Sequence, residues 1–131
     1  MAAYQQAAEL DPSWFEAQYN AGVLAQRQGE YPDALASYEK ALAIQPDSVS
    51  ARYNFALTLR SAGYSLDAAS ELKKIIAAKP DEVRAHLTLA NLYAQALHDP
   101  AQARIHYLKV LELEPSSPYA SDIRFWLAAN P

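Results

Sequence analysis

The stretch Asp33–Pro46, DALASYEKALAIQP, has the pattern of one amphipathic helix that stops at a proline. Its apolar residues on one side are Tyr38, Ala41, Leu42 and Ile44. Counted from the tyrosine, the others follow at offsets of three, four and six, so the four share one helical face. This face predicts a helix that packs against a neighbour.

The same pattern recurs along the chain. It precedes prolines that are separated by 34, 34 and 35 residues, namely Pro12, Pro46, Pro80 and Pro115. A period of this length is typical of a helix–turn–helix unit that stacks on copies of itself. The chain therefore consists of repeats.

A second kind of helix is expected between these helices. Each copy carries a small residue at a corresponding place, in the pairs Ala21-Gly22, Phe55-Ala56 and Leu89-Ala90. Two helices approach closely only where one of them lacks a bulky side chain, so these positions predict helix pairs. Gly29 and Gly63 follow this second helix, where a left-handed C-terminal cap favours glycine.

In each repeat the helix of the second kind, with its small residue, comes first, and the helix that ends at the proline follows it. This order and the period resemble the tetratricopeptide repeat (TPR) family over nearly the whole chain. The resemblance implies an all-α fold, a right-handed α-solenoid of helix–turn–helix repeats. We expect a single domain over 1–131. Its expected parts are a leading half repeat at 1–12, full repeats at 13–46, 47–80 and 81–115, and a C-terminal capping helix at 116–131.

Some positions depart from the family pattern. The aromatic residue usual early in the first helix of a repeat is replaced by Gln18, Arg52 and His86. In the third repeat Leu97 replaces the turn glycine, and the unit is one residue longer. Asp99 and Pro100 follow as an N-cap and a first-turn proline, so the insertion is expected to lengthen a turn.

The chain begins in the middle of a repeat. We expect that Met1 opens an excised segment of a longer protein; the alternative is that the first helix of this repeat has been lost.

The composition excludes some classes of binding partner. The 131 residues carry a formal charge of −4 without a run of basic residues, which argues against a nucleic-acid partner. No apolar run approaches the roughly 18–20 residues of a bilayer span, so membrane insertion is not expected. Cysteine is absent. We expect a soluble protein and lean toward the cytoplasm, although the sequence does not fix the compartment.

No group of residues suited to catalysis or metal binding is expected. The histidines fall on different elements, His86 on an inner helix, His98 in a turn and His106 on an outer helix, so we expect solvated or half-buried imidazoles and no metal. The three glycines are isolated and form no phosphate loop. We expect no enzyme, no catalytic residue and no cofactor. Charges on the outer helices, such as Lys40 and Glu71, are expected to be solvated.

The resemblance implies that the first helix of each repeat lines a concave groove, where a peptide of a partner protein binds. Steps of three or four residues define the stripe that points into this groove. The candidate peptide-binding residues are Tyr19, Asn20, Val23, Arg27, Tyr53, Asn54, Leu57, Arg60, Arg84, Leu87 and Asn91.

Two features of this stripe suggest the ligand. Asn20 and Asn54 lie one period apart, and an asparagine amide can both donate to and accept from a peptide backbone. Arg27, Arg60 and Arg84 favour an acidic peptide. The alternatives are that the asparagines are incidental polar residues and that the arginines only solvate helix ends.

Chaperone-binding members of the family use a clamp of lysine, asparagine and arginine side chains for a C-terminal carboxylate. Asn54 and Arg84 match two of its places, whereas Tyr19, Val23 and Thr88 occupy the other three. We therefore do not expect a co-chaperone.

The sequence thus predicts a non-enzymatic scaffold for protein–protein interaction, as a monomer or a weak homodimer. One alternative is a self-assembly module that stacks through its terminal helices, where Phe125 lies beside Trp126. A second alternative is a regulatory appendage of a larger protein.

Overall fold

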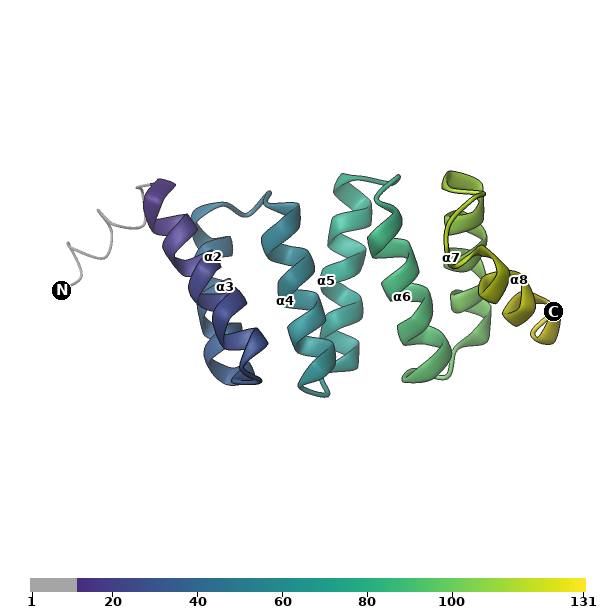
Figure 1. Cartoon of the computed structure of the whole chain (residues 1–131), viewed down its shortest axis with the longest axis horizontal. Helices are drawn as coiled ribbons and strands as arrows, with labels where there is room; N and C mark the ends of the chain where they lie inside the picture. The colour runs from purple at the N-terminus through teal and green to yellow at the C-terminus, as the bar shows by residue number, and fades with distance from the viewer. Residues whose placement is uncertain (1–11) are drawn as a thin grey trace. The chain divides into compact units, whose positions relative to one another are not determined.

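The computed structural model describes residues 12–131, and this part of the chain consists of helices without a strand (Figure 1). The helices are α2 (Pro12–Arg27), α3 (Tyr31–Ile44), α4 (Val49–Ser61), α5 (Ser65–Ala78), α6 (Val83–Gln95), α7 (Pro100–Leu113) and α8 (Ala120–Ala129). The expected all-α class and the helix–turn–helix repeats are confirmed. The leading half repeat was expected at 1–12, and its residues 1–11 lie outside the described part of the chain.

Side-chain capping marks where two helices, α4 and α7, begin. The Ser48 side chain accepts a hydrogen bond from the backbone N–H of Ala51 (3.2 Å) at the start of α4. Asp99 accepts from the backbone N–H of Gln102 (3.2 Å) at the start of α7. Each cap satisfies a donor that the first helical turn leaves without a partner. The predicted N-cap at Asp99 is therefore confirmed.

The turns after α2, α4 and α6 use left-handed backbone. Gly29 and Gly63 have φ angles of 75° and 92°, as a glycine cap requires. In the third repeat the left-handed residue is His98, with φ of 51°. The additional residue of this repeat thus moves the left-handed position from Leu97 to the next residue.

The chain divides into two compact units, with the boundary after Glu71 inside α5. Unit 1 contains α2, α3, α4 and the first part of α5; unit 2 contains the rest of α5 and the helices α6 to α8. The single domain expected over the whole chain remains a prediction.

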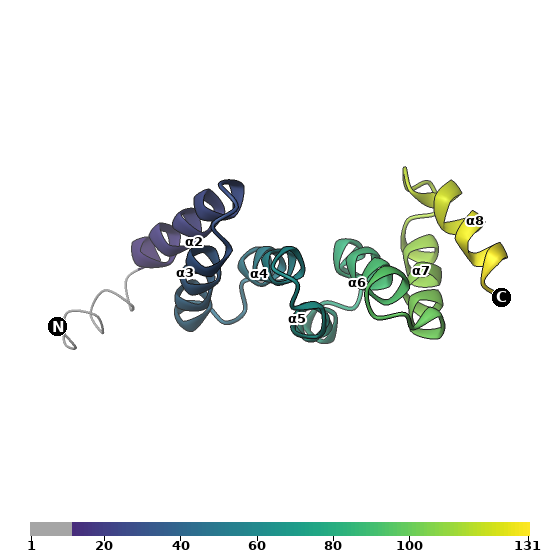
Figure 2. The same cartoon turned by 90° about the horizontal axis from the view of Figure 1, so that it is seen from below.

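Unit 1 is organised around Tyr38 of α3, which is fully buried. Helix α3 packs against both α2 and α4 (Figure 2). A methyl group added at Gly22 of α2 would come within 2.7 Å of the Tyr38 ring. The glycine therefore allows the tyrosine to lie directly against the helix, which is the close approach that the small residues predict.

Unit 2 has a corresponding tyrosine, Tyr107 of α7, which is 5% exposed. Helix α7 packs against α6 and contacts α8. Ala90 of α6 and Ala103 of α7 have no exposed surface, so these two helices also approach through small residues. The buried Ile123 attaches α8 to this unit.

Candidate functional site

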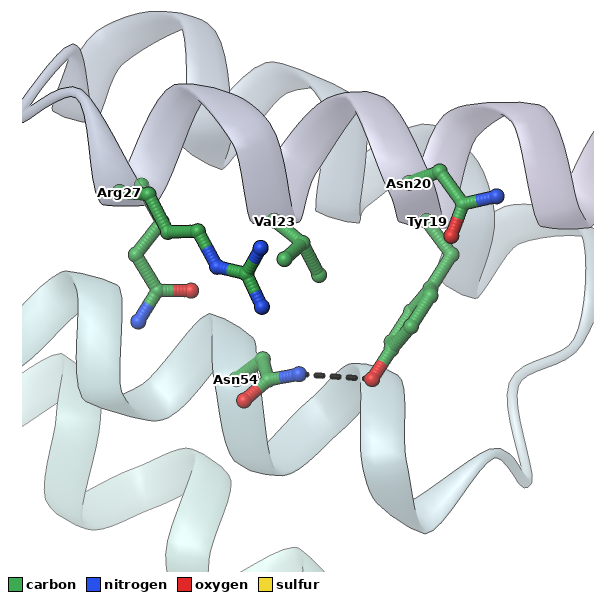
Figure 3. Close-up of a pocket in the computed structure, with 6 residues that line it drawn as sticks. Tyr19, Asn20, Val23, Arg27 and Asn54 are labelled. Atoms are coloured by element: carbon green, nitrogen blue, oxygen red, sulfur yellow. Dashed lines mark hydrogen bonds between the residues drawn. The ribbon is translucent and has the colours of Figure 1, made fainter.

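Unit 1 contains a pocket between α2 and α4, with a volume of about 590 Å³. Its lining residues are Tyr19, Asn20, Val23, Gln26, Arg27 and Asn54 (Figure 3). Five of them come from α2, and Asn54 is the contribution of α4. We call it the α2–α4 pocket.

A hydrogen bond across the α2–α4 pocket joins its two helices. The side-chain amide of Asn54 donates to the Tyr19 hydroxyl over 2.8 Å (Figure 3). The Tyr19 ring also contacts Phe15 in a stacked arrangement and the edge of Tyr38, with centroids 6.0 and 6.2 Å apart. The asparagine amide is thus held in place, and it keeps a second N–H and its carbonyl oxygen for a ligand.

The amide of Gln26 is oriented in a similar way. The Tyr38 hydroxyl donates to Gln26 Oε1 over 2.6 Å. Burial, with a smaller effect of Tyr19, raises the pKa of Tyr38 to about 12, so the hydroxyl keeps its proton and remains a donor at neutral pH. Two of the three side-chain amides that line the pocket, those of Asn54 and Gln26, are therefore positioned by tyrosine hydroxyls.

Arg27 gives the α2–α4 pocket its charge. It is exposed, and the other five lining residues are uncharged. Its guanidinium extends into the space beside Val23 and toward Asn54 (Figure 3). A cation together with fixed amides forms a surface that suits an acidic group attached to a peptide backbone.

The structure brings some of the predicted site residues together and leaves others apart. Tyr19, Asn20, Val23, Arg27 and Asn54 share the α2–α4 pocket. Leu87 and Asn91 line a second pocket in unit 2. The predicted site residues that line neither of these two pockets are Tyr53, Leu57, Arg60 and Arg84.

One lining residue and one ion pair are absent from the sequence prediction. Gln26 follows Val23 by three positions and Tyr19 by seven, so the helical spacing alone was sufficient to include it. Arg84 forms an exposed ion pair with Glu82, with 2.8 Å between Nε and Oε1. This pair competes with an acidic ligand for the arginine.

Two corresponding positions carry a polar contact in place of the usual aromatic residue. Arg52 of α4 donates from Nη2 to the carbonyl oxygen of Pro46 (2.8 Å) and from Nη1 to Glu71 Oε1 (2.6 Å). We call this contact the Arg52–Glu71 pair. Glu71 is only 8% exposed, so the expectation that it is a solvated surface charge was wrong.

One period later, His86 of α6 makes the corresponding contacts. Its Nε2 lies 2.7 Å from the carbonyl oxygen of Pro80, and its Nδ1 lies 3.0 Å from Nδ1 of His106 on α7. We call this contact the His86–His106 pair. The sequence placed these two histidines on different helices and did not predict their contact.

The carbonyl oxygen of Pro80 fixes the place of one proton of the pair. Only an N–H can face a carbonyl, so His86 carries a proton on Nε2, and its Nδ1 shares a hydrogen bond with Nδ1 of His106. Burial, then His86 and then Lys73, lowers the pKa of His106 to about 4. The His106 ring is therefore neutral at pH 7. Among the described residues, no group of three or more metal-ligating side chains is arranged to hold a metal.

Comparison with protein families identifies the repeats. A model described as "TPR repeat" matches residues 27–63, and one described as "Tetratricopeptide repeat" matches residues 53–121, which is more than half of the chain. The chain belongs to the tetratricopeptide repeat family. Proteins of this family and fold are generally non-catalytic modules of protein interaction. A search of curated protein sequences finds no match.

Solved structures with the same fold include complexes with segments of other proteins. The first TPR domain of Spaghetti (RPAP3), bound to the HSP90 peptide SRMEEVD, is 23% identical, with a TM-score of 0.81 and coverage of 92% of this chain and 96% of that chain. PcrH of Pseudomonas aeruginosa, in complex with the chaperone binding region of PopB, is 16% identical, with a TM-score of 0.76 and coverage of 93% and 98%.

A third structure is the type III secretion translocator chaperone SycD of Yersinia enterocolitica, in an alternative dimer. It is 15% identical, with a TM-score of 0.80 and coverage of 91% of this chain and 92% of that chain. At these identities the similarity establishes the fold. Within residues 12–131, no helix has both the length and the apolar character that crossing a bilayer requires.

Proposed function

We propose that this chain is a non-enzymatic scaffold that binds an extended peptide segment of a partner protein, with the α2–α4 pocket as the main contact. The observation that carries the proposal is the combination, in one open pocket, of the Arg27 cation with two amides that tyrosine hydroxyls hold in position. Fixed amides lose little conformational entropy when they bind a peptide backbone.

The ligand that fits this pocket is an acidic segment. Arg27 supplies the charge, and Asn54 and Gln26 supply hydrogen-bonding groups for the backbone. The acidic peptide SRMEEVD bound to the TPR domain of RPAP3 supports the same ligand class. The other candidate groove residues named from the sequence, including Tyr53 and Arg60, remain predicted contacts.

The test begins with a phage-displayed library of random 12-residue peptides, selected on the intact chain. Affinities of the selected peptides are then measured by fluorescence anisotropy. The double variant Asn20→Ala/Asn54→Ala is expected to bind at least about tenfold more weakly, because each lost amide leaves a peptide group without a partner. Arg27→Ala is expected to weaken acidic peptides selectively, and added salt is expected to have the same effect.

Two controls separate binding from folding. Glu39→Ala/Lys40→Ala alters two exposed charges on α3 and should leave the affinity unchanged. Melting curves report whether each variant folds. Affinities that survive the asparagine pair but fall with the α3 pair would show that peptides bind elsewhere.

A second candidate function is self-assembly through the terminal helix α8. Phe125 of this helix is 80% exposed and offers a large apolar surface for contact with a second copy. The dimer in the SycD structure supports this candidate. Sedimentation at several concentrations tests it: a dimer that persists at low micromolar concentration and dissociates with Phe125→Ser would favour self-assembly over peptide binding.

A further inference from the structure

Unit 2 contains a smaller pocket whose walls are aromatic. It lies among α6, α7 and α8 and has a volume of about 260 Å³. Tyr107, Tyr119 and Trp126 all line it, and they come from α7, from the residue before α8 and from α8 itself. We call it the aromatic pocket.

The aromatic side chains differ in how firmly they are held. The buried Tyr107 donates from its hydroxyl to Oδ1 of Asn91 over 2.5 Å and contacts the Trp126 ring, with centroids 4.9 Å apart and planes tilted by 55°. Tyr119 is 53% exposed, at the edge of the pocket. The pocket therefore has a fixed aromatic base and one ring that solvent reaches.

The charge in the aromatic pocket is negative. Asp122 lies in the first turn of α8 and is exposed, and the other lining residues are uncharged. Aromatic faces attract cations through the quadrupole of the ring, and a carboxylate beside them adds direct attraction. The volume lies below the roughly 300–1,000 Å³ of small-molecule sites, so it suits one long side chain.

We propose that the aromatic pocket binds the side chain of an arginine from a partner protein. A planar guanidinium can stack on an aromatic ring and at the same time donate two parallel hydrogen bonds to a carboxylate. A lysine ammonium offers a point charge without a plane for stacking, and it is more strongly hydrated. The proposal uses residues of unit 2 alone, so it stands or falls separately from the α2–α4 pocket.

The test uses the whole ¹⁵N-labelled chain and small probes. The chain has two tryptophans, so Trp126 and Trp14 give two indole N–H signals, which the variant Trp14→Phe assigns. N-acetyl-L-arginine amide is expected to shift the Trp126 signal in a saturable way and to leave the Trp14 signal in place. N-acetyl-L-citrulline amide, the neutral isostere, should cause no saturable shift. N-acetyl-L-lysine amide should bind roughly threefold or more weakly than the arginine probe.

Matched variants test the two kinds of contact. Asp122→Asn should weaken the arginine probe by roughly threefold or more, whereas Asp81→Asn, at another exposed carboxylate of unit 2, should not. Tyr119→Ala should weaken it to a similar extent, whereas Phe125→Ala, at an exposed ring outside the pocket, should not. All four positions are exposed, so folding should survive.

Three results would overturn the proposal: an unmoved Trp126 signal with the arginine probe, an equal response to citrulline, or equal binding by the Asp122→Asn and Asp81→Asn variants. Equal affinity for the lysine probe would overturn the assignment to arginine. Loss of peptide binding in the α2–α4 pocket would leave these results unchanged, so the two proposals fail separately.

Discussion

The two pockets are built on corresponding tyrosines but present opposite chemistry. Tyr38 and Tyr107 lie two repeats apart, and each donates its hydroxyl to an amide oxygen of the preceding helix, on Gln26 and on Asn91. The pockets differ in the helix that lines their other side. In the α2–α4 pocket α4 supplies Asn54, whereas in the aromatic pocket α8 supplies Trp126 and the acidic Asp122. The repeat therefore determines where a pocket forms, and the neighbouring helix determines what it can bind.

The polar contacts of the two units also lie at corresponding positions but differ in chemistry. The Arg52–Glu71 pair and the His86–His106 pair occupy corresponding positions and use the carbonyl oxygens of corresponding prolines. One contact is an ion pair, and the other joins two imidazole rings, of which His106 gains a proton only at acidic pH. The units should therefore respond differently to substitution and to pH.

The largest effect is expected from Glu71→Gln in unit 1. This change leaves the Arg52 guanidinium without its carboxylate, at a side chain that is only 18% exposed. We expect a loss of about 2–3 kcal/mol in the free energy of unfolding, somewhat below the cost for a fully buried pair. Urea denaturation at pH 7 measures it. Glu39→Gln, at an exposed site on α3, is the control, and an equally small effect of both changes would show that the pair does not stabilise unit 1.

A smaller effect, specific to unit 2, is expected on acidification. The pKa of His106 is lowered to about 4 in the folded chain, so between the ordinary value of 6.5 and pH 4 the unfolded chain binds a proton that the folded chain does not. Stability is therefore fully present above pH 6.5 and decreases as the pH falls. From pH 6.5 to 5 we expect a loss of about 1–2 kcal/mol.

The three histidines of the chain all lie in unit 2, at positions 86, 98 and 106, so the comparison can be made with single substitutions. Urea denaturation across this pH range should show that the free energy of unfolding changes less steeply with pH in His106→Gln than in the parent chain. His98→Gln, at an exposed turn, should keep the slope of the parent chain. A slope that persists in His106→Gln would assign the pH dependence to other groups.

The smallest effect is expected at the turn after α6. His98 adopts a φ of 51°, where glycine at Gly29 and Gly63 serves the other repeats. His98→Gly should stabilise the chain by about 0.5–1 kcal/mol, because relief of the left-handed backbone exceeds the added freedom of the unfolded chain. Thermal melting is sensitive enough to detect this. A lower melting temperature would mean that the histidine side chain supports the turn.

The helices and turns could be predicted from the sequence because their causes are local. The small residues at Gly22 and Ala90 and the cap at Asp99 are each visible within a few residues, and the proline period repeats the same short pattern along the chain. One difference at this level, the left-handed residue at His98, follows from a single insertion whose exact position the spacing did not determine.

The polar contacts and pockets depend on residues that are distant in the sequence. Glu71 resembles a surface charge until Arg52 is placed 2.6 Å away, and His86 meets His106 across two helices. The aromatic pocket was likewise not predicted, because α8 was interpreted as a cap and its residues Asp122 and Trp126 were not considered as a wall. Periodicity assigns a residue to a face, but it does not identify the partner across that face.

The central claim is that an acidic peptide contacts Arg27 in the α2–α4 pocket, and a charge-reversal cycle tests it most directly. Affinities are measured by titration calorimetry for the parent chain and Arg27→Glu, each with a selected acidic peptide and with the same peptide in which one acidic residue is changed to lysine. We predict that each single change weakens binding and that the double change restores much of it, with a coupling of about 1–2 kcal/mol. A double change that weakens binding by the full product of the two single effects would contradict the account.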